Sequence, residues 1–318
     1  ISAAVDPAGN IFIWDPGSFR IQEFDAAGRY LRTIGKKGEG PGEFASPHQL
    51  RFLADGSGRL FVRDNAKIHE FSPEGGFIRS IPASASGNRQ FAVLSSGSVV
   101  RDDWAFEQDK MSETIVLTDG DGKRLKTIAG FPSHKFEAVM KDKPRFTVYY
   151  PELVLAPWIR GAAVFGFPAE YRISGVDGRG EMTLIVEKAG PPARFTSVEK
   201  GRIVDGFLAG KPGIARAELM KQRLVPDFWP FFDAFLADGR GRIYVRRVRS
   251  NLESDPGTVF DLFSPEGFFL QEVKTAEPDC AAMRRELHPH KHLTLQLLWQ
   301  EYREQHPEGY GYSRYCSL

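Results

Sequence analysis

A hydrophobic motif built around a glycine recurs five times along this chain, and it limits the fold more than any other feature. In each copy an apolar residue is followed three positions later by an apolar residue or Thr, and four positions after that by Gly. Apolar or Thr residues follow at three and six positions beyond the Gly. The copies centre on Gly28, Gly75, Gly122, Gly180 and Gly267. Two strands around a turn, repeated first at 47 residues (75 − 28), are typical of β-propeller blades.

A second hairpin motif precedes most of these copies. It has the pattern Asp-x-x-Gly-x-apolar-x-apolar and begins at Asp6, Asp55 and Asp238. Asp and Gly favour a tight reversal, and the alternation after the Gly favours a strand with one buried face. Before these turns, or their degenerate counterpart in the third blade, we expect the innermost strands over 2–5, 50–53, 91–94 and 233–236. Four strands per repeat predict an all-β propeller with five recognisable blades.

The later repeats are longer than the first ones, which predicts an insertion before the fifth blade. Thr196-Ser197-Val198-Glu199 is a capping box that we expect to open a helix running to Phe207. The segment 214–224 has the apolar spacing of a second helix, so we place a helical insertion at about 196–225. Such an excursion suits either a lid or binding element, or a helical pair packed over a blade edge.

The glycine-rich stretch Gly35–Phe44 is interpreted as a connector between strands, because a phosphate-binding loop would lead into a helix.

Composition excludes some classes of function. Lys and Arg number 42 against 41 Asp and Glu, which argues against a general surface for binding polyanions. The only cysteines, Cys280 and Cys316, lie near the end of the chain, so the propeller has neither a disulfide framework nor a thiol metal site. No run of 18 apolar residues occurs, and we predict no membrane span. The chain begins inside a blade, without Met or a signal peptide, which we interpret as a processed or truncated end.

The stretches Asp6–Asp15 and Gly35–Phe44 resemble the bacterial six-bladed β-propeller proteins related to NHL repeats. The resemblance covers roughly residues 1–275, and Gly-Pro-Gly-Glu-Phe at 40–44 is its most specific part. It implies six blades, an extracytoplasmic (periplasmic or secreted) location and, in most members, no assigned enzymatic activity. This chain departs from the pattern because the sixth blade, due from about residue 275, is missing or incomplete.

The composition changes abruptly from Pro278 onward. The run LTLQLLWQEYREQHPEGYGYSRYC, at 293–316, resembles IstA-type insertion-sequence transposases between their first helix-turn-helix and their catalytic core. We therefore predict a helical, transposase-like fragment over 278–318 and a composite reading frame, in which a mobile element interrupts a propeller gene. By this resemblance Tyr310, Ser313 and Arg314 would contact DNA. The transposase's catalytic acids lie beyond the chain, so its chemistry does not carry over.

Few residues of the propeller suggest chemistry. The predicted inner strands offer His48, Arg51 and Asp233 as residues that could line a ligand channel, but they do not form a set of metal ligands. Asp102 and Asp103 are expected in a solvated turn. His288, His290 and His292 alternate as ligands on one strand would, although Pro289 and their loop setting favour an exposed loop. We predict no metal site, no cofactor and no catalytic group.

These observations favour a non-catalytic binding or scaffold protein, whose propeller binds an unknown protein or small-molecule ligand. The alternative is a DNA-binding transposase fragment, with DNA contacted only through the C-terminal segment. A metal-dependent propeller hydrolase or lyase is the third possibility.

Overall fold

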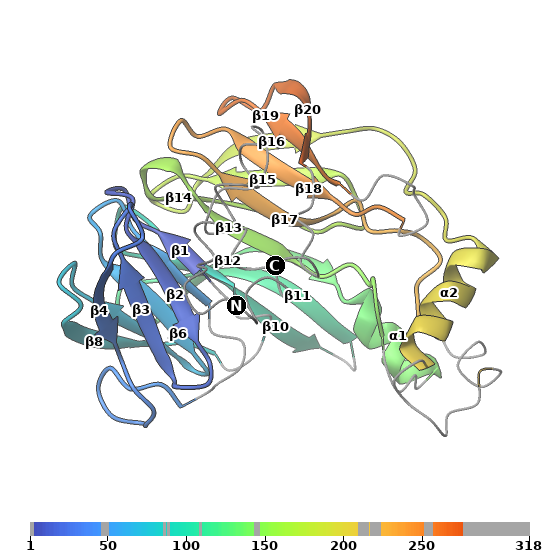
Figure 1. The fold of residues 1–318 in the computed structure, drawn as a ribbon. Helices are drawn as coiled ribbons and strands as arrows, with labels where there is room; N and C mark the ends of the chain where they lie inside the picture. The colour runs from blue at the N-terminus through green and yellow to red at the C-terminus, as the bar shows by residue number, and fades with distance from the viewer. Residues whose placement is uncertain are drawn as a thin grey trace. The chain divides into compact units, whose positions relative to one another are not determined.

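The structure is a computed structural model that describes residues 3–45, 51–84, 87, 90–107, 110–142, 147–208, 216, 224–250 and 257–275. These residues form five four-stranded sheets, and the strands of each sheet lie side by side in chain order (Figure 1). The strand pairs of the first and second sheets are antiparallel. The predicted all-β fold with five propeller blades is therefore confirmed.

Each blade contains one inner and one outer hairpin. Blade 1 comprises β1 (Ala3–Val5), β2 (Ile11–Asp15), β3 (Arg20–Phe24) and β4 (Tyr30–Ile34), and blade 2 comprises β5 (Arg51–Ala54), β6 (Leu60–Asp64), β7 (Lys67–Phe71) and β8 (Phe77–Pro82). Blade 3 comprises β9 (Phe91–Val93), β10 (Val99–Glu107), β11 (Lys110–Thr118) and β12 (Arg124–Pro132). Blade 4 comprises β13 (Val154–Trp158), β14 (Ala162–Gly166), β15 (Arg172–Val176) and β16 (Met182–Glu187), and blade 5 comprises β17 (Phe232–Ala237), β18 (Ile243–Arg247), β19 (Thr258–Phe263) and β20 (Phe269–Thr275).

The chain divides into two compact units, which are described separately. Unit 1 contains blades 1 and 2 together with the hairpin tip Thr118–Arg124. Unit 2 contains the rest of blade 3, blade 4, blade 5 as far as Val273, and the helices α1 (His134–Asp142) and α2 (Ser197–Leu208). Among the described residues, no helix combines the length and the apolar character needed to cross a bilayer.

The recurrent Asp and Gly residues build the same turn in inner and outer hairpins. One side-chain oxygen of Asp55 accepts hydrogen bonds from the backbone N–H groups of Ser57 and Arg59, and Asp25 makes the equivalent pair of bonds in its own turn. The Arg29 N–H bond holds the pKa of Asp25 below its usual value. Equivalent pairs of bonds form at Asp119, Asp177 and Asp238. The turn is thus determined locally, which explains why it is readable in the sequence.

The turn glycines of the outer hairpins also allow a close approach to the preceding blade. Gly122 has a φ of +84°, and a Cβ atom there would lie 2.3 Å from the carbonyl oxygen of Pro82, at the end of β8. A Cβ on Gly75 would lie 3.1 Å from side-chain atoms of Arg32 and Ile34 on β4. Conformation and space therefore both select glycine at these repeat positions.

The connector Gly35–Phe44 places one aromatic side chain, Phe44, in the core of unit 1. Phe44 is completely buried and packs edge-on against Trp14, with ring centroids 5.4 Å apart, and also against Phe71. Lys36 pairs with Glu43 across the loop at 3.1 Å. Strands β4 and β5 flank the stretch on either side, so its interpretation as a connector is confirmed.

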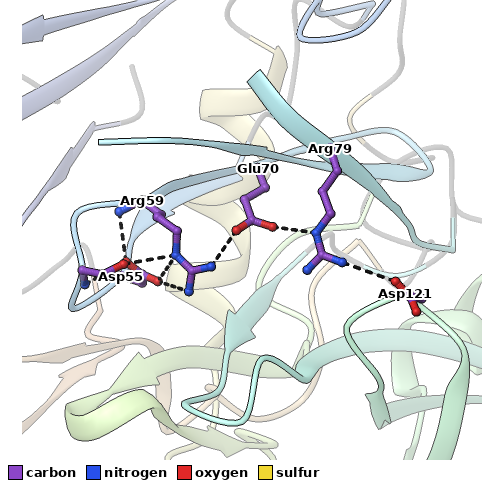
Figure 2. A network of polar contacts seen from close by, with 6 residues as sticks. Asp55, Arg59, Glu70, Arg79 and Asp121 are labelled. Atoms are coloured by element: carbon purple, nitrogen blue, oxygen red, sulfur yellow. Dashed lines mark hydrogen bonds and ion pairs between the residues drawn. The ribbon is translucent and has the colours of Figure 1, made fainter. Parts of the chain in front are cut away.

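A polar ladder runs across blade 2 within unit 1 (Figure 2). The buried carboxylate of Glu70 accepts hydrogen bonds from Arg59 Nη1 at 2.7 Å and from Arg79 Nε at 2.8 Å. Arg59 also bonds to Asp55, the turn residue of the inner hairpin, and Arg79 reaches Asp121 at 3.3 Å. The ladder therefore connects blade 2 with the hairpin tip that belongs to its unit.

Two apolar clusters hold unit 2 together. One lies between blades 3 and 4 and includes Leu117, Leu155 and Phe165. The other lies between blades 4 and 5 and includes Val164, Phe235 and Val245. Because each cluster takes side chains from two successive blades, the blades of this unit stabilise one another by burying apolar surface.

The capping box predicted at Thr196 is confirmed at the start of α2. Thr196 Oγ1 accepts the Glu199 N–H at 3.2 Å, and Glu199 Oε2 accepts the Thr196 N–H at 2.6 Å. Almost all of the second predicted helix, 214–224, lies outside the described residues, as does the predicted fragment 278–318. The boundary between the propeller and that fragment remains a prediction.

The expectation of a solvated turn at Asp102 and Asp103 is wrong. Both residues lie within β10 and are buried. Strands β10 and β11 are nine residues long, so the sheet continues through positions where a turn was expected. The charge of Asp103 is balanced by the buried Arg101, 2.8 Å away, which makes burial of both groups tolerable.

Candidate functional site

The residues predicted to line a channel give no assembled site. Arg51 is exposed at the start of β5 in unit 1. Asp233 is exposed on β17 in unit 2, where it pairs with Arg246 at 2.6 Å. His48 lies outside the described residues, as do Tyr310, Ser313, Arg314 and the three alternating histidines. The channel and the DNA contacts therefore remain predictions.

Unit 2 contains a cavity of about 360 Å³ beside helix α1, and we call it the α1 pocket. Its walls come from α1, from the segment that leads into β13, and from the segment 225–229 that returns the chain from the insertion to blade 5. Most of the lining is apolar, and it includes the prolines and aromatic residues Tyr150, Pro151, Pro192, Pro226, Phe228 and Trp229. A largely apolar wall of this size suits a small organic ligand.

The charged and ionisable side chains of the α1 pocket come from two segments, helix α1 and the return segment. His134, Glu137 and Lys141 come from α1, and Asp227 comes from the return segment. His134 Nδ1 lies 3.9 Å from Glu137 Oε2, and Asp227 is paired with Lys200 of α2 at 2.9 Å. Groups of both signs beside an apolar wall are suited to orienting a ligand that carries a polar or charged substituent.

Three aromatic rings support the wall formed by the return segment. Trp229 stacks on Phe195 with ring centroids 3.8 Å apart, and Tyr149 packs against Trp229 at 5.0 Å. Tyr149 has a φ of +59°, a left-handed conformation that is costly for an aromatic residue. Packing against two rings compensates for that strain, so the trio fixes the chain where it turns toward the pocket.

Backbone hydrogen bonds reinforce this support. The Trp229 N–H donates to the carbonyl of Ala193 at 2.8 Å, and the Phe195 N–H donates to the carbonyl of Asp227 at 3.0 Å. The Val148 N–H donates to the carbonyl of Leu224 at 2.9 Å. The return segment is thereby joined both to the chain before α2 and to the chain after α1.

Helix α1 is fixed at its start by a serine cap and a buried carboxylate. Ser133 Oγ accepts the Phe136 N–H at 3.3 Å and donates to Glu113 Oε1 at 3.2 Å. Glu113 Oε2 accepts the Leu153 N–H at 2.8 Å. Burial raises the pKa of Glu113 to about 7, although the Leu153 bond opposes the shift; nearby Glu152 and Asp102 raise it further.

A second cavity, of about 270 Å³, shares His134 and Ala169 with the α1 pocket. Its wall includes Phe131 and Phe167, whose rings stack with centroids 5.3 Å apart and planes inclined by 10°. The ring of His134 packs on Phe167 at 5.7 Å. His134 therefore borders both cavities.

Helix α1 was not predicted from the sequence. The signals were the 58-residue step between Gly122 and Gly180, 11 residues longer than the basic repeat, and the Ser at 133 before apolar residues at 136, 139 and 140. Within the described ranges, no three His, Cys, Asp or Glu side chains gather as a metal site would require.

Comparisons with known proteins match this chain both to a propeller family and to a transposase. Residues 4–81 match the family DUF5128, described as a 6-bladed beta-propeller. A proposed transposase of Sinorhizobium fredii is 56% identical over 69 residues, which are 20% of this chain and 13% of that protein. The chain thus spans only about an eighth of this relative's length. The resemblance to both propellers and transposases is confirmed.

Several solved structures are similar to this chain at low sequence identity. A proposed exported protein from Bacteroides fragilis is 13% identical, with a TM-score of 0.46 over 83% of this chain and 68% of that chain. A gluconolactonase from Xanthomonas campestris is 12% identical, with a TM-score of 0.43 over 86% of this chain and 75% of that chain.

Proposed function

We propose that this protein is a non-catalytic propeller that binds a small organic ligand in the α1 pocket of unit 2. The observation that carries the proposal is the construction of this pocket from two segments that the regular repeat does not need, the α1 excursion and the return from the insertion. Binding functions are commonly carried by such excursions on a rigid scaffold. The proline and aromatic walls favour a ligand with an apolar ring, and the polar groups of α1 favour a polar substituent on it.

The test uses the fluorescent dye 8-anilinonaphthalene-1-sulfonate, which combines an apolar ring system with a charged group. Ala138 is a buried residue of α1 that lines the pocket, so Ala138→Trp would fill it. The matched control is Ala27→Trp, in an exposed turn of unit 1. We expect saturable, one-to-one fluorescence enhancement with the native protein and the control, and at least a tenfold weaker affinity with Ala138→Trp.

Equal binding by all three proteins would refute the proposal. If Ala138→Trp does not fold, transfer of magnetisation between the dye and the ring protons of Phe228 and Trp229, which line the pocket, decides the matter in the native protein. The absence of that transfer would place the dye elsewhere and would equally refute the proposal.

A second candidate function, DNA binding through the C-terminal segment, is supported by the 56% identity to a proposed transposase. Its test is fluorescence anisotropy with a duplex that carries an insertion-sequence terminal repeat. Phosphate contacts would make the affinity fall steeply between 50 and 200 mM salt, by about tenfold or more. Arg314→Ala should weaken binding, whereas Arg29→Ala in blade 1 should not; equal binding by both variants would exclude the assigned residues.

The extracytoplasmic location also remains a proposal, supported by the family resemblance. Fractionation of cells that express the native gene would test it, and recovery only with the cytoplasmic proteins would contradict it.

A further inference from the structure

The second cavity of unit 2, of about 270 Å³, lies between two blades, and we call it the blade 3–4 cavity. Blade 3 contributes residues of β12 to its wall, and blade 4 contributes residues of β14, β15 and β16. Apart from His134 and Ala169, none of its lining residues belongs to the α1 pocket. The cavity is therefore a second place at which unit 2 can receive a ligand.

The neighbouring interface, between blades 4 and 5, is bridged by a tyrosine. Tyr171 stands two residues before Ile173, the first apolar residue of the repeated motif in blade 4, and Asp261 stands one residue after the equivalent Phe260 in blade 5. The Tyr171 hydroxyl donates to Asp261 Oδ2 at 2.6 Å, and both residues are buried. A phenol from one blade thus satisfies a polar group of the next blade.

The equivalent positions between blades 3 and 4 hold Glu113 and Ser174, and these two residues do not bond to each other. The Glu113 carboxyl group is bonded to Ser133 and to Leu153 instead. Ser174 is 6% exposed and lines the blade 3–4 cavity, and its hydroxyl makes no hydrogen bond to any described residue. Where the next interface contains a bonded phenol, this one has a cavity beside a serine hydroxyl that is available to a ligand.

The wall of the blade 3–4 cavity suits an aromatic ring. Phe131 of β12 and Phe167, directly after β14, stack with their planes inclined by 10°. Phe165 and Met182 complete this apolar part of the lining. Aromatic rings and a thioether favour contact with a further ring over contact with an aliphatic chain.

Charged groups of both signs lie at the exposed end of the lining. Arg172 lies on the same face of β15 as Ser174, because side chains alternate along a strand, and Glu170 precedes the strand by two residues. Both charged residues are exposed. Arg172 pairs with Glu187 at 2.9 Å, but that pair is largely solvated, so the guanidinium group retains donors for a second carboxylate. Glu170 makes no ion pair with any described residue.

We propose that the blade 3–4 cavity binds a zwitterionic aromatic amino acid whose ring carries a hydroxyl group. The ring packs against Phe131 and Phe167, and its hydroxyl bonds to Ser174, in place of the phenol that bridges the next interface. The carboxylate pairs with Arg172, and the ammonium group pairs with Glu170. This site goes beyond the function proposed for the α1 pocket and does not depend on it.

Isothermal titration calorimetry on the full chain tests the proposal with L-tyrosine and three analogues that each lack one group. We expect saturable, one-to-one binding of L-tyrosine. L-Phenylalanine, which lacks the hydroxyl, should bind about fivefold more weakly. Tyramine lacks the carboxylate and 3-(4-hydroxyphenyl)propionate lacks the ammonium group, and each should bind about tenfold more weakly.

Variants assign each preference to its residue. Ser174→Ala should abolish the preference for L-tyrosine over L-phenylalanine, and Arg172→Gln should abolish the preference for L-tyrosine over tyramine. The matched control Arg179→Gln, at an exposed residue that does not line the cavity, should keep both preferences. If Ser174→Ala fails to fold, the result for Arg172→Gln decides the matter.

Absence of L-tyrosine binding, or preferences that are unchanged in the variants, would overturn the proposal. Dye binding that is lost in Ala138→Trp reports on the α1 pocket, to which Ser174 and Arg172 do not belong. Failure of this site and failure of the proposed function are therefore distinguishable.

Discussion

The indole ring of Trp229 stacks on the phenyl ring of Phe195, with centroids 3.8 Å apart and planes inclined by 26°. The two residues lie on either side of the insertion that contains α2, and backbone bonds between 193–195 and 227–229 hold the flanking segments together. The stack therefore closes the insertion at its base and forms the support of the α1 pocket.

Trp229→Ala should destabilise unit 2 strongly because it removes a 6% exposed ring from a packed aromatic trio. Truncation of a buried Trp typically costs about 3–5 kcal/mol. Urea unfolding followed by circular dichroism measures the loss. Trp104→Ala, at a residue that is 39% exposed, is the control and should cost much less; equal losses would contradict the role of the stack.

Glu70→Ala should destabilise unit 1 because it removes the shared acceptor of Arg59 and Arg79. Breaking a buried charged network by removing one partner costs several kcal/mol at most, and the partial exposure of both arginines reduces this to about 1–3 kcal/mol. Asp121→Ala, at the exposed end of the same ladder, should leave the urea midpoint almost unchanged. A larger effect at Asp121 than at Glu70 would show that the ladder is anchored at the hairpin tip instead.

Gly122→Ala should destabilise the chain for two independent reasons. Its φ is +84°, and the new Cβ would lie 2.3 Å from the Pro82 carbonyl oxygen, so the strained turn would also have to move. We expect a loss of at least about 2 kcal/mol in urea unfolding. Gly56→Ala is the matched control, since a Cβ there meets nothing within 4 Å. A neutral Gly122→Ala would show that the repeated glycine serves only the turn.

The blades were predictable because their signals are local. The Asp and Gly residues of each turn bond to atoms within four positions, and the apolar positions follow the alternation of a strand, so five hairpin pairs are readable without knowledge of the fold. The helix at Thr196 was predictable for the same reason, since both partners of its capping box lie within four residues.

The α1 pocket was not predictable, because it depends on contacts between distant segments. Glu113 bonds to Leu153, 40 positions away, and Trp229 packs on Tyr149 and Phe195 from separate parts of the chain. The prediction of a solvated turn at Asp102 and Asp103 was wrong for a related reason. Two adjacent acids suggest a solvated turn, and only the length of β10 and the position of Arg101 reveal that they are buried. A sequence pattern records local geometry, whereas the burial of a charge depends on how the surrounding sheet packs, even where its partner is close in the sequence.

The buried carboxyl group of Glu113 should make the stability of unit 2 depend on pH. Its pKa is raised to about 7 in the folded chain, and 4.5 is its ordinary value. Between these values the folded state binds the proton and the unfolded state does not, so the contribution of Glu113 is fully present below about pH 4.5 and is lost as the pH rises through about 7. A shift of this size corresponds to about 3 kcal/mol.

The turn carboxylates such as Asp25 and Asp177, whose pKa values are lowered, act in the opposite direction, so stability must be compared between variants. Urea unfolding of the native protein and Glu113→Gln at pH 5 and pH 8 isolates the effect: the native protein should lose stability relative to the variant at the higher pH, and a constant difference between the two proteins would mean that Glu113 does not titrate in this range.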